Sequence, residues 1–177
     1  MDLVVDGTDG AGKTPLVAAL CESLRARGHE VATYAPYRVE EVFPLWQSEP
    51  RRAAAIITGH MERFRDAHPR AVIVWDRGWP TAWVSTDDAQ ARDAFRPLPA
   101  VTVLLLNTTR TTRFRAAKHA STAPWMVEDE LIERFNAAYR ALAGATDATI
   151  LAYQPGAEDR FDYAPIVLET LTAAGLG

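Results

Sequence analysis

The sequence predicts one α/β domain of three layers, in which helices cover both faces of a doubly wound parallel sheet. Short apolar runs alternate along the chain with segments whose apolar residues recur at helical spacing, which is the order of elements in such a domain. The runs centred on residues 73 and 104 are apolar almost without interruption, as expected for strands buried on both faces. A chain of 177 residues fills one such core and is too short for two ordinary domains. Residues 1–177 are therefore expected to form a single domain.

The elements follow in a regular order. The five expected strands occupy residues 2–6, 30–35, 71–75, 101–106 and 148–152. The segment 16–27 has helical spacing and is closed by Gly28, prolines mark an irregular connection after the second strand, and the Ala-rich segment 163–174 predicts a final helix. Ligands of such sheets bind outside the carboxyl ends of the strands. We therefore expect a crevice formed by residues 6–14, 34–38, 76–79 and 107–110.

The composition narrows the class of protein. A chain that is 48% hydrophobic and 24% charged is typical of a globular protein in water, and a formal net charge of -4 argues against broad nucleic-acid binding. The one cysteine, Cys21, excludes an intramolecular disulfide and is expected to be a buried, inert thiol. No leader segment and no apolar stretch long enough for a membrane span stand out, which favours a cytoplasmic protein.

The stretch GTDGAGKT carries the strongest functional signal. It fits the spacing G-x-x-x-x-G-K-[ST] between a predicted strand and a predicted helix, the context in which this pattern forms a phosphate-binding loop. Backbone N–H groups and the helix N-terminus would hold the phosphates of ATP, Lys13 would reach the β- and γ-phosphates, and the Thr14 hydroxyl would bind Mg²⁺. The predicted nucleotide-binding residues are Gly7, Thr8, Asp9, Gly10, Ala11, Gly12, Lys13 and Thr14.

Two further groups of polar residues follow the third and fourth strands. Asp76 and Arg77 come directly after a buried strand, where Asp76 can act near Mg²⁺ and Arg77 can pair with a phosphate. The segment from about 110 to 126 is rich in basic residues, including Arg113 and Arg115. It predicts a lid that brings positive charge onto a transferring phosphoryl group, although a solvated helix face has the same pattern.

These motifs together resemble the thymidylate kinase family of nucleoside monophosphate kinases, over most of the chain and in the same order. The resemblance implies the P-loop nucleotide kinase fold, ATP as donor, Mg²⁺ as cofactor and an Arg-rich lid. It also implies that Asp9 contacts the acceptor's sugar hydroxyl, that Arg77 binds the acceptor's phosphate, and that Arg113 or Arg115 supplies the lid charge. Members of the family commonly form homodimers.

The sequence departs from the family's pattern around the acceptor. Pro15 replaces a hydroxyl residue and disfavours helical backbone at Thr14, although a proline is tolerated in a first helical turn. Asn107 stands where an acid is common, and DRG replaces the usual DRY or DRH. The glycine-rich phosphate contact after the second strand is missing, with Arg38 as a substitute. Phe64 and Arg63 are the candidates for stacking on the base and reading it.

The chemistry of the acceptor favours a phosphate over a hydroxyl. A nucleoside monophosphate already offers an anionic oxygen and needs no general base, whereas a hydroxyl acceptor gains from a nearby carboxylate. The second strand ends Tyr34-Ala35-Pro36-Tyr37, with no acid where deoxynucleoside kinases place one. The sequence therefore predicts a Mg²⁺- and ATP-dependent kinase of a pyrimidine deoxynucleoside monophosphate similar to dTMP.

Two alternatives remain open. The first is a kinase of a hydroxyl acceptor, either a deoxynucleoside or a 5-hydroxymethyl pyrimidine in DNA, with Asp9 or Asp76 as the base. In the DNA case Trp75, Trp79 and Trp83 would stack on a flipped base, although Trp79 and Trp83 have the spacing of core residues on a helix. The second is a non-catalytic ATP-binding switch. A GTP switch is disfavoured because the sequence has no N-K-x-D motif.

Overall fold

A computed structural model gives the fold of the chain. The structure describes residues 1–8, 10–38, 42, 45–86, 100–106, 129–145, 149–153 and 162–177. Its strands are β1 (Asp2–Gly7), β2 (Val31–Tyr34), β3 (Val72–Asp76), β4 (Ala100–Leu105) and β5 (Ile150–Tyr153). Its helices are α1 (Lys13–Ala26), the short 3₁₀ helix η1 (Pro36–Arg38), α2 (Leu45–Ser48), α3 (Pro50–Ala67), α4 (Trp79–Val84), α7 (Asp129–Ala145) and α8 (Ala164–Ala173).

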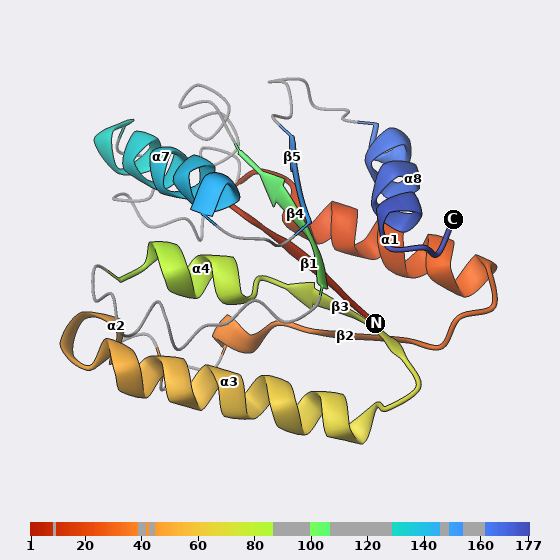
Figure 1. Cartoon of the computed structure of the whole chain (residues 1–177), viewed down its shortest axis with the longest axis horizontal. Helices are drawn as coiled ribbons and strands as arrows, with labels where there is room; N and C mark the ends of the chain where they lie inside the picture. Colours follow the sequence, from red (N-terminus) through yellow and green to blue (C-terminus); the bar gives the residue numbers. More distant parts are fainter. Residues whose placement is uncertain are drawn as a thin grey trace.

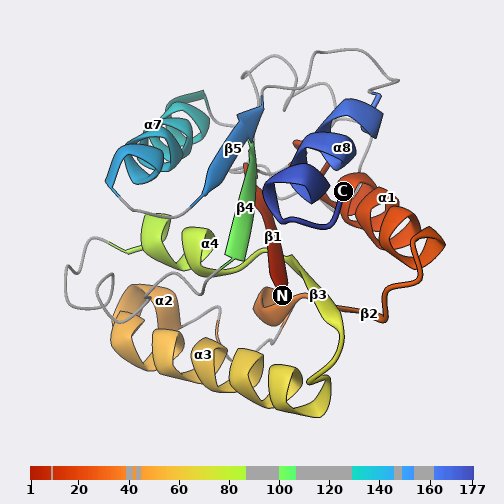
Figure 2. The same cartoon turned by 45° about the vertical axis from the view of Figure 1, so that its right-hand side comes forward.

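The five strands form one parallel sheet in the order β2-β3-β1-β4-β5. Helices α1 and α8 cover one face, and α3, α4 and α7 cover the other (Figures 1 and 2). The predicted doubly wound sheet of three layers is confirmed, and each of the five predicted strands is present within two residues of its expected bounds. From β1 the chain builds the sheet to one side through β2 and β3 and to the other through β4 and β5. The switch point for ligands therefore lies at the carboxyl end of β1.

The alternation of side chains along β1 decides which helices its last polar residue meets. Leu3 and Val5 pack in the core beneath α1 and α8, whereas Val4 packs in the core beneath α3, α4 and α7. Successive side chains of a strand point to opposite faces. Asp6 therefore shares the face of Val4 and points toward α4 and α7, and its side chain is fully buried.

Helix α1 begins at Lys13, three residues before the predicted start. Gly12 precedes it with a left-handed backbone, φ 91°, which turns the chain from the loop into the helix. Pro15 occupies the third helical position, where its missing N–H costs no intrahelical bond because first-turn N–H groups have no acceptor within the helix. The expectation that Pro15 allows the helix to start is confirmed.

Two tryptophans belong to the core and one lies at its margin. Trp75 has no exposed surface and Trp79 is 3% exposed, while Trp83 on α4 is half-buried. The Trp79 indole N–H donates to the hydroxyl of Thr102 on β4 at 3.3 Å. Trp79 thus has the packing role that its spacing with Trp83 favoured, Trp83 packs there only in part, and Trp75 is also a core residue. No helix within the described ranges is both long and apolar enough to cross a membrane.

Candidate phosphoryl-transfer site

The loop between β1 and α1 requires glycine at its first position. Gly7 has φ 128°, and a Cβ atom there would lie 2.0 Å from the carbonyl oxygen of Leu105 on the adjacent strand β4. The following amide, of Thr8, donates to that same oxygen at 3.1 Å. Gly10, with φ 72°, and Gly12 are also left-handed. The backbone is therefore folded tightly against β4, in a course that residues with side chains rarely follow.

The side chain of Lys13 lies against the backbone of this loop. Its side chain is largely buried, with 8% of the residue exposed, and Nζ donates to the carbonyl oxygens of Gly7 at 3.1 Å and Thr8 at 2.7 Å. The ammonium group thus lies inside the loop, close to the N-terminus of α1. Thr14 follows in the first turn of α1 with its side chain exposed. The Lys13 ammonium group, the helix N-terminus and the exposed Thr14 hydroxyl together suit the phosphates and metal of a nucleotide.

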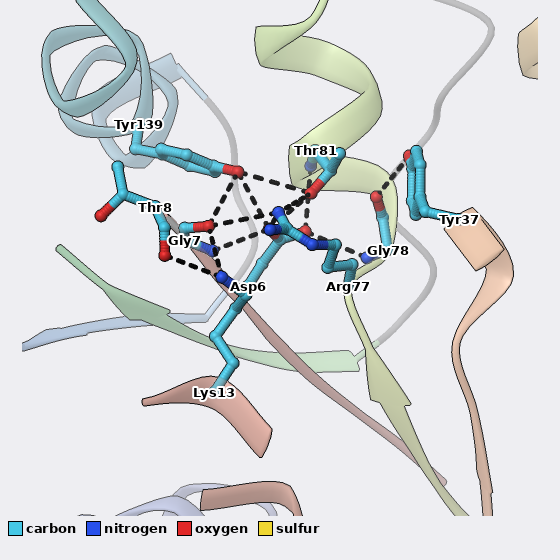
Figure 3. Close-up of polar contacts among 9 residues, drawn as sticks. All are labelled: Asp6, Gly7, Thr8, Lys13, Tyr37, Arg77, Gly78, Thr81 and Tyr139. Atoms are coloured by element: carbon cyan, nitrogen blue, oxygen red, sulfur yellow. Dashed lines mark hydrogen bonds and ion pairs between the residues drawn. The ribbon is translucent and has the colours of Figure 1, made fainter. Parts of the chain in front are cut away.

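Asp6 is the centre of a buried polar network (Figure 3). Its Oδ1 accepts hydrogen bonds from the Gly7 amide at 2.7 Å, the Thr81 hydroxyl at 2.6 Å and the Tyr139 hydroxyl at 3.0 Å. Its Oδ2 accepts from the amides of Gly78 at 3.0 Å and Thr81 at 2.9 Å. The last two amides lie at the N-terminus of α4, so the carboxylate of β1 caps a helix from another part of the chain.

Arg77 completes the network with an unusual backbone. It is the one residue other than glycine with positive φ in the described part of the chain, at 72°. Its Nη1 lies 3.9 Å from Oδ1 of Asp6 and donates to the Gly7 carbonyl and to the Thr81 hydroxyl, both at 3.3 Å. A left-handed arginine is costly unless its surroundings hold it there, and such residues concentrate at functional sites.

Two tyrosines close the site from either side. Tyr139 of α7 lies against Asp6 and Thr81, and the Tyr37 hydroxyl of η1 donates to the Gly78 carbonyl at 2.8 Å (Figure 3). Burial raises the pKa of both phenols well above the ordinary value of 10.0, and the negative charge of Asp6 raises each pKa further. Both tyrosines are therefore neutral donors at physiological pH.

The predicted metal ligands suit Mg²⁺. Asp76 is the last residue of β3, aligned with Val5 of β1, and is half-buried. The described residues include no group of three or more His, Cys, Asp or Glu side chains able to hold a metal. Mg²⁺ commonly takes only one or two protein oxygens and completes its shell with water and phosphate oxygens. The carboxylate of Asp76 and the hydroxyl of Thr14 are hard oxygen donors of this kind.

The remaining predicted residues are placed as follows. Phe64 of α3 is stacked on Tyr34 of β2, with ring centroids 4.7 Å apart, and its ring edge meets Trp75 at 5.7 Å, so it packs against the sheet. Arg63 lies on the exposed side of α3. Arg38 ends η1, and its side chain is outside the described part of the structure. Asp9 and the whole segment 107–128, with Arg113 and Arg115, also lie outside the described residues.

Four residues of the network, Asp6, Tyr37, Thr81 and Tyr139, were given no role from the sequence, although Asp6 and Tyr37 lie within the predicted crevice. Asp6 had a local signal, because an acid ends an apolar strand directly before the loop. Thr81 also had a weak one, because it lies in the first turn of α4, two residues after Trp79. Nothing local marks Tyr139, which is one of two aromatic residues, with Phe135, on the amphipathic helix α7.

Comparison with solved structures gives the same architecture. Thymidylate kinase from Ehrlichia chaffeensis has a TM-score of 0.66 at 15% sequence identity, over 99% of this chain and 98% of that chain. This is the fold of a nucleotide kinase. Deoxyadenosine kinase from M. mycoides has a TM-score of 0.62 at 16% identity, both with dCMP and dCDP bound, over 99% of each chain, and with dATP bound, over 100% of each chain. The resemblance to thymidylate kinases that the sequence indicated is thus confirmed for the fold. The sequence matches no protein-family model and no curated protein.

Proposed function

We propose that this protein transfers the γ-phosphoryl group of ATP to a pyrimidine deoxynucleoside monophosphate similar to dTMP. One observation carries the proposal: Lys13 Nζ and Arg77 Nη1 donate to the same oxygen, the Gly7 carbonyl, at 3.1 and 3.3 Å (Figure 3). Lys13 belongs to the loop that suits the donor's phosphates, and Arg77 follows a neighbouring strand. Two cations held beside one carbonyl suit a reaction that brings the donor's γ-phosphate next to the acceptor's phosphate.

Different residues of the chain have different roles in such a transfer. The loop amides and Lys13 hold the β- and γ-phosphates, and Thr14 and Asp76 serve Mg²⁺. The metal, when bound, neutralises charge on the phosphate oxygens. Arg77 orients the acceptor through paired N–H donors, and Asp9 contacts its sugar. Arg113 and Arg115 place positive charge over the transferring group and exclude water.

A monophosphate acceptor is favoured because the site offers cations and because no acid follows β2, where deoxynucleoside kinases place their base. A nucleoside monophosphate is already anionic, so positioning and charge stabilisation are sufficient. Ala35 is the single residue between β2 and η1, so no carboxylate follows the strand directly. The likeness to a thymidylate kinase is in keeping with this acceptor.

A hydroxyl acceptor is the second candidate, favoured by the likeness to a deoxyadenosine kinase. In that case Asp76 or Asp9 takes the proton of a deoxynucleoside hydroxyl or of a 5-hydroxymethyl pyrimidine in DNA. The burial of Trp75 and Trp79 counts against their use as a stacking platform for a base flipped from DNA. A non-catalytic ATP-binding switch is the third candidate. It has no need of a strained arginine beside the loop.

The deciding experiment measures transfer of labelled γ-phosphate from Mg-ATP to four classes of acceptor. The panel holds dTMP, other nucleoside monophosphates, free deoxynucleosides, and DNA carrying 5-hydroxymethyl pyrimidines. Label on dTMP or a close relative is the expected result. Label on a hydroxyl acceptor alone overturns the monophosphate assignment and makes Asp9 or Asp76 the base. ATP binding without transfer to any acceptor, together with unchanged ATP affinity in Arg77→Ala, identifies a switch.

A further inference from the structure

The acceptor capacity of the Asp6 carboxylate is fully used by the protein itself. An ionised carboxylate offers about four lone-pair sites, and Asp6 receives five hydrogen bonds from three amides and two hydroxyls. Its side chain has no exposed surface. Asp6 therefore has no room to accept a substrate proton or to bind a metal ion. Its role is to hold other groups in place.

The Thr81 hydroxyl links Asp6 to Arg77 and fixes the direction of an Arg77 N–H group. A threonine hydroxyl has one proton to donate, and the short 2.6 Å contact assigns it to Oδ1 of Asp6. The lone pairs of that hydroxyl are then turned toward Arg77, whose Nη1 donates to it at 3.3 Å. The second Nη1 proton is directed at the Gly7 carbonyl, also at 3.3 Å. Both protons of one guanidinium nitrogen thus have a fixed direction.

The backbone beneath Arg77 is held by the same carboxylate. Oδ2 of Asp6 accepts from the amide of Gly78, the next residue, and from the amide of Thr81. The Arg77 amide donates to the carbonyl of Val5 on β1 at 2.9 Å. These bonds surround a residue with φ 72° and oppose its relaxation to an ordinary backbone.

A guanidinium is a rigid plane, so fixing Nη1 also fixes the direction of the three N–H donors on Nε and Nη2. Paired N–H donors of this kind match two oxygens of a phosphate, and the match depends on orientation. A freely rotating arginine would lose that advantage, since it must be ordered each time a ligand binds.

We propose that Asp6 and Thr81 are positioning residues that set the orientation of the Arg77 guanidinium toward the phosphate of a nucleoside monophosphate acceptor. The proposal rests on the function proposed above and adds to it the residues that tune acceptor affinity. Neither residue touches the acceptor. Their effect reaches it through Arg77.

The test compares the acceptor KM, the ATP KM and kcat of four proteins: the unsubstituted chain, Thr81→Val, Thr81→Ser and Thr170→Val. Thr81→Val keeps the shape of the side chain and the hydrogen bond that the backbone N–H of residue 81 donates to Asp6, and removes the hydroxyl. Thr170→Val is the matched control, because the Thr170 hydroxyl is also buried and donates within its own helix, α8, to the Ile166 carbonyl at 2.7 Å. Melting temperatures are recorded for all four.

The expected result is a rise of roughly ten-fold in the acceptor KM of Thr81→Val, the size of effect that one hydrogen bond to a charged group supports. The ATP KM stays within about two-fold, because Lys13 and the loop amides are untouched. Thr81→Ser restores the acceptor KM. Thr170→Val lowers the melting temperature and leaves the acceptor KM unchanged. If Thr81→Val does not fold, Thr81→Cys retains a weak thiol donor and is expected to give an intermediate rise in acceptor KM.

An acceptor KM that is the same in Thr81→Val and Thr170→Val overturns the positioning role while leaving the kinase function intact. An equal rise in the acceptor and ATP KM values also overturns it, since that is the signature of a general disturbance of the site. No transfer by the unsubstituted chain to any acceptor overturns the proposed function, and the positioning role with it.

Discussion

Oδ1 of Asp6 lies 3.9 Å from Nη1 of Arg77, and the carboxylate is fully buried while 23% of the arginine side chain is exposed. The pair joins the end of β1 to the turn before α4. One charge is therefore sealed inside the protein by hydrogen bonds, and the other remains partly open to a ligand. This division makes Asp6 a structural anchor and leaves Arg77 partly exposed, and it motivates the first prediction.

Asp6→Asn is expected to lower the free energy of unfolding by about 2–5 kcal/mol, because one acceptor oxygen becomes an NH₂ group, itself a donor, where the network supplies only donors, and because Arg77 loses its counter-charge. Urea denaturation followed by circular dichroism measures the change. Asp162→Asn is the control: Asp162 is exposed and accepts from the Ala164 amide at 2.9 Å. Equal, small losses in the two variants would contradict the anchoring role.

Gly7→Ala is expected to abolish ATP binding and to destabilise the fold by more than about 3 kcal/mol, because the added Cβ overlaps the Leu105 carbonyl and φ is 128°. Gly28→Ala separates the two causes. Gly28 also has positive φ, 84°, but a Cβ there meets nothing within 4 Å. Its expected cost is about 1–2 kcal/mol with ATP binding retained. Binding of a fluorescent ATP analogue and denaturant unfolding provide both readouts.

Lys13→Ala is expected to abolish phosphoryl transfer, because Nζ is the cation held inside the loop. Arg25→Ala removes an exposed cation from the same helix and is expected to leave the rate unchanged. Initial rates with saturating acceptor measure the difference. Near-normal turnover in Lys13→Ala would remove the loop from the donor site.

Arg113→Ala is expected to lower turnover far more than ATP affinity, because a lid cation acts on charge that develops during transfer. Single-turnover rates and equilibrium ATP binding separate the two quantities. Arg140→Ala, an exposed cation of α7, is the control. An unchanged rate in Arg113→Ala would exclude it as a lid residue and direct the same measurement to Arg115.

The stability of the protein is expected to fall as the pH rises above about 10. Burial and the charge of Asp6 raise the folded-state pKa of Tyr37 and Tyr139 well above 10.0. The unfolded chain then loses both phenolic protons at lower pH than the folded chain does. The stabilisation is complete below pH 10 and is lost as the pH rises toward the folded-state pKa values. Urea unfolding across this range measures the slope, and replacing both tyrosines with phenylalanine is expected to flatten it. A slope unchanged by that double substitution would place the titration elsewhere.

Local patterns were sufficient for the elements and for the glycine loop between β1 and α1. Continuous apolar runs predicted β3 and β4, because strands buried on both faces have no polar side to alternate with. The spacing from Gly7 to Thr14 predicted the loop, because a tight turn into a helix needs glycines and a lysine at fixed separations along one short segment. Arg77 was predicted from its position after a strand.

What the sequence by itself determined is the order of the elements, the tight glycine loop between β1 and α1 and the kinase fold to which they point, since each depends on residues that are neighbours in the chain. Only the tertiary structure decided that Asp6 is saturated and that Arg77 is oriented. The partners of Asp6 are Thr81, 75 positions away, and Tyr139, 133 positions away. Their meeting depends on the alternation along β1 and on how α4 and α7 pack over one face of the sheet. A buried carboxylate finds its donors only when those long-range contacts have formed, so its role cannot be read from the residues beside it.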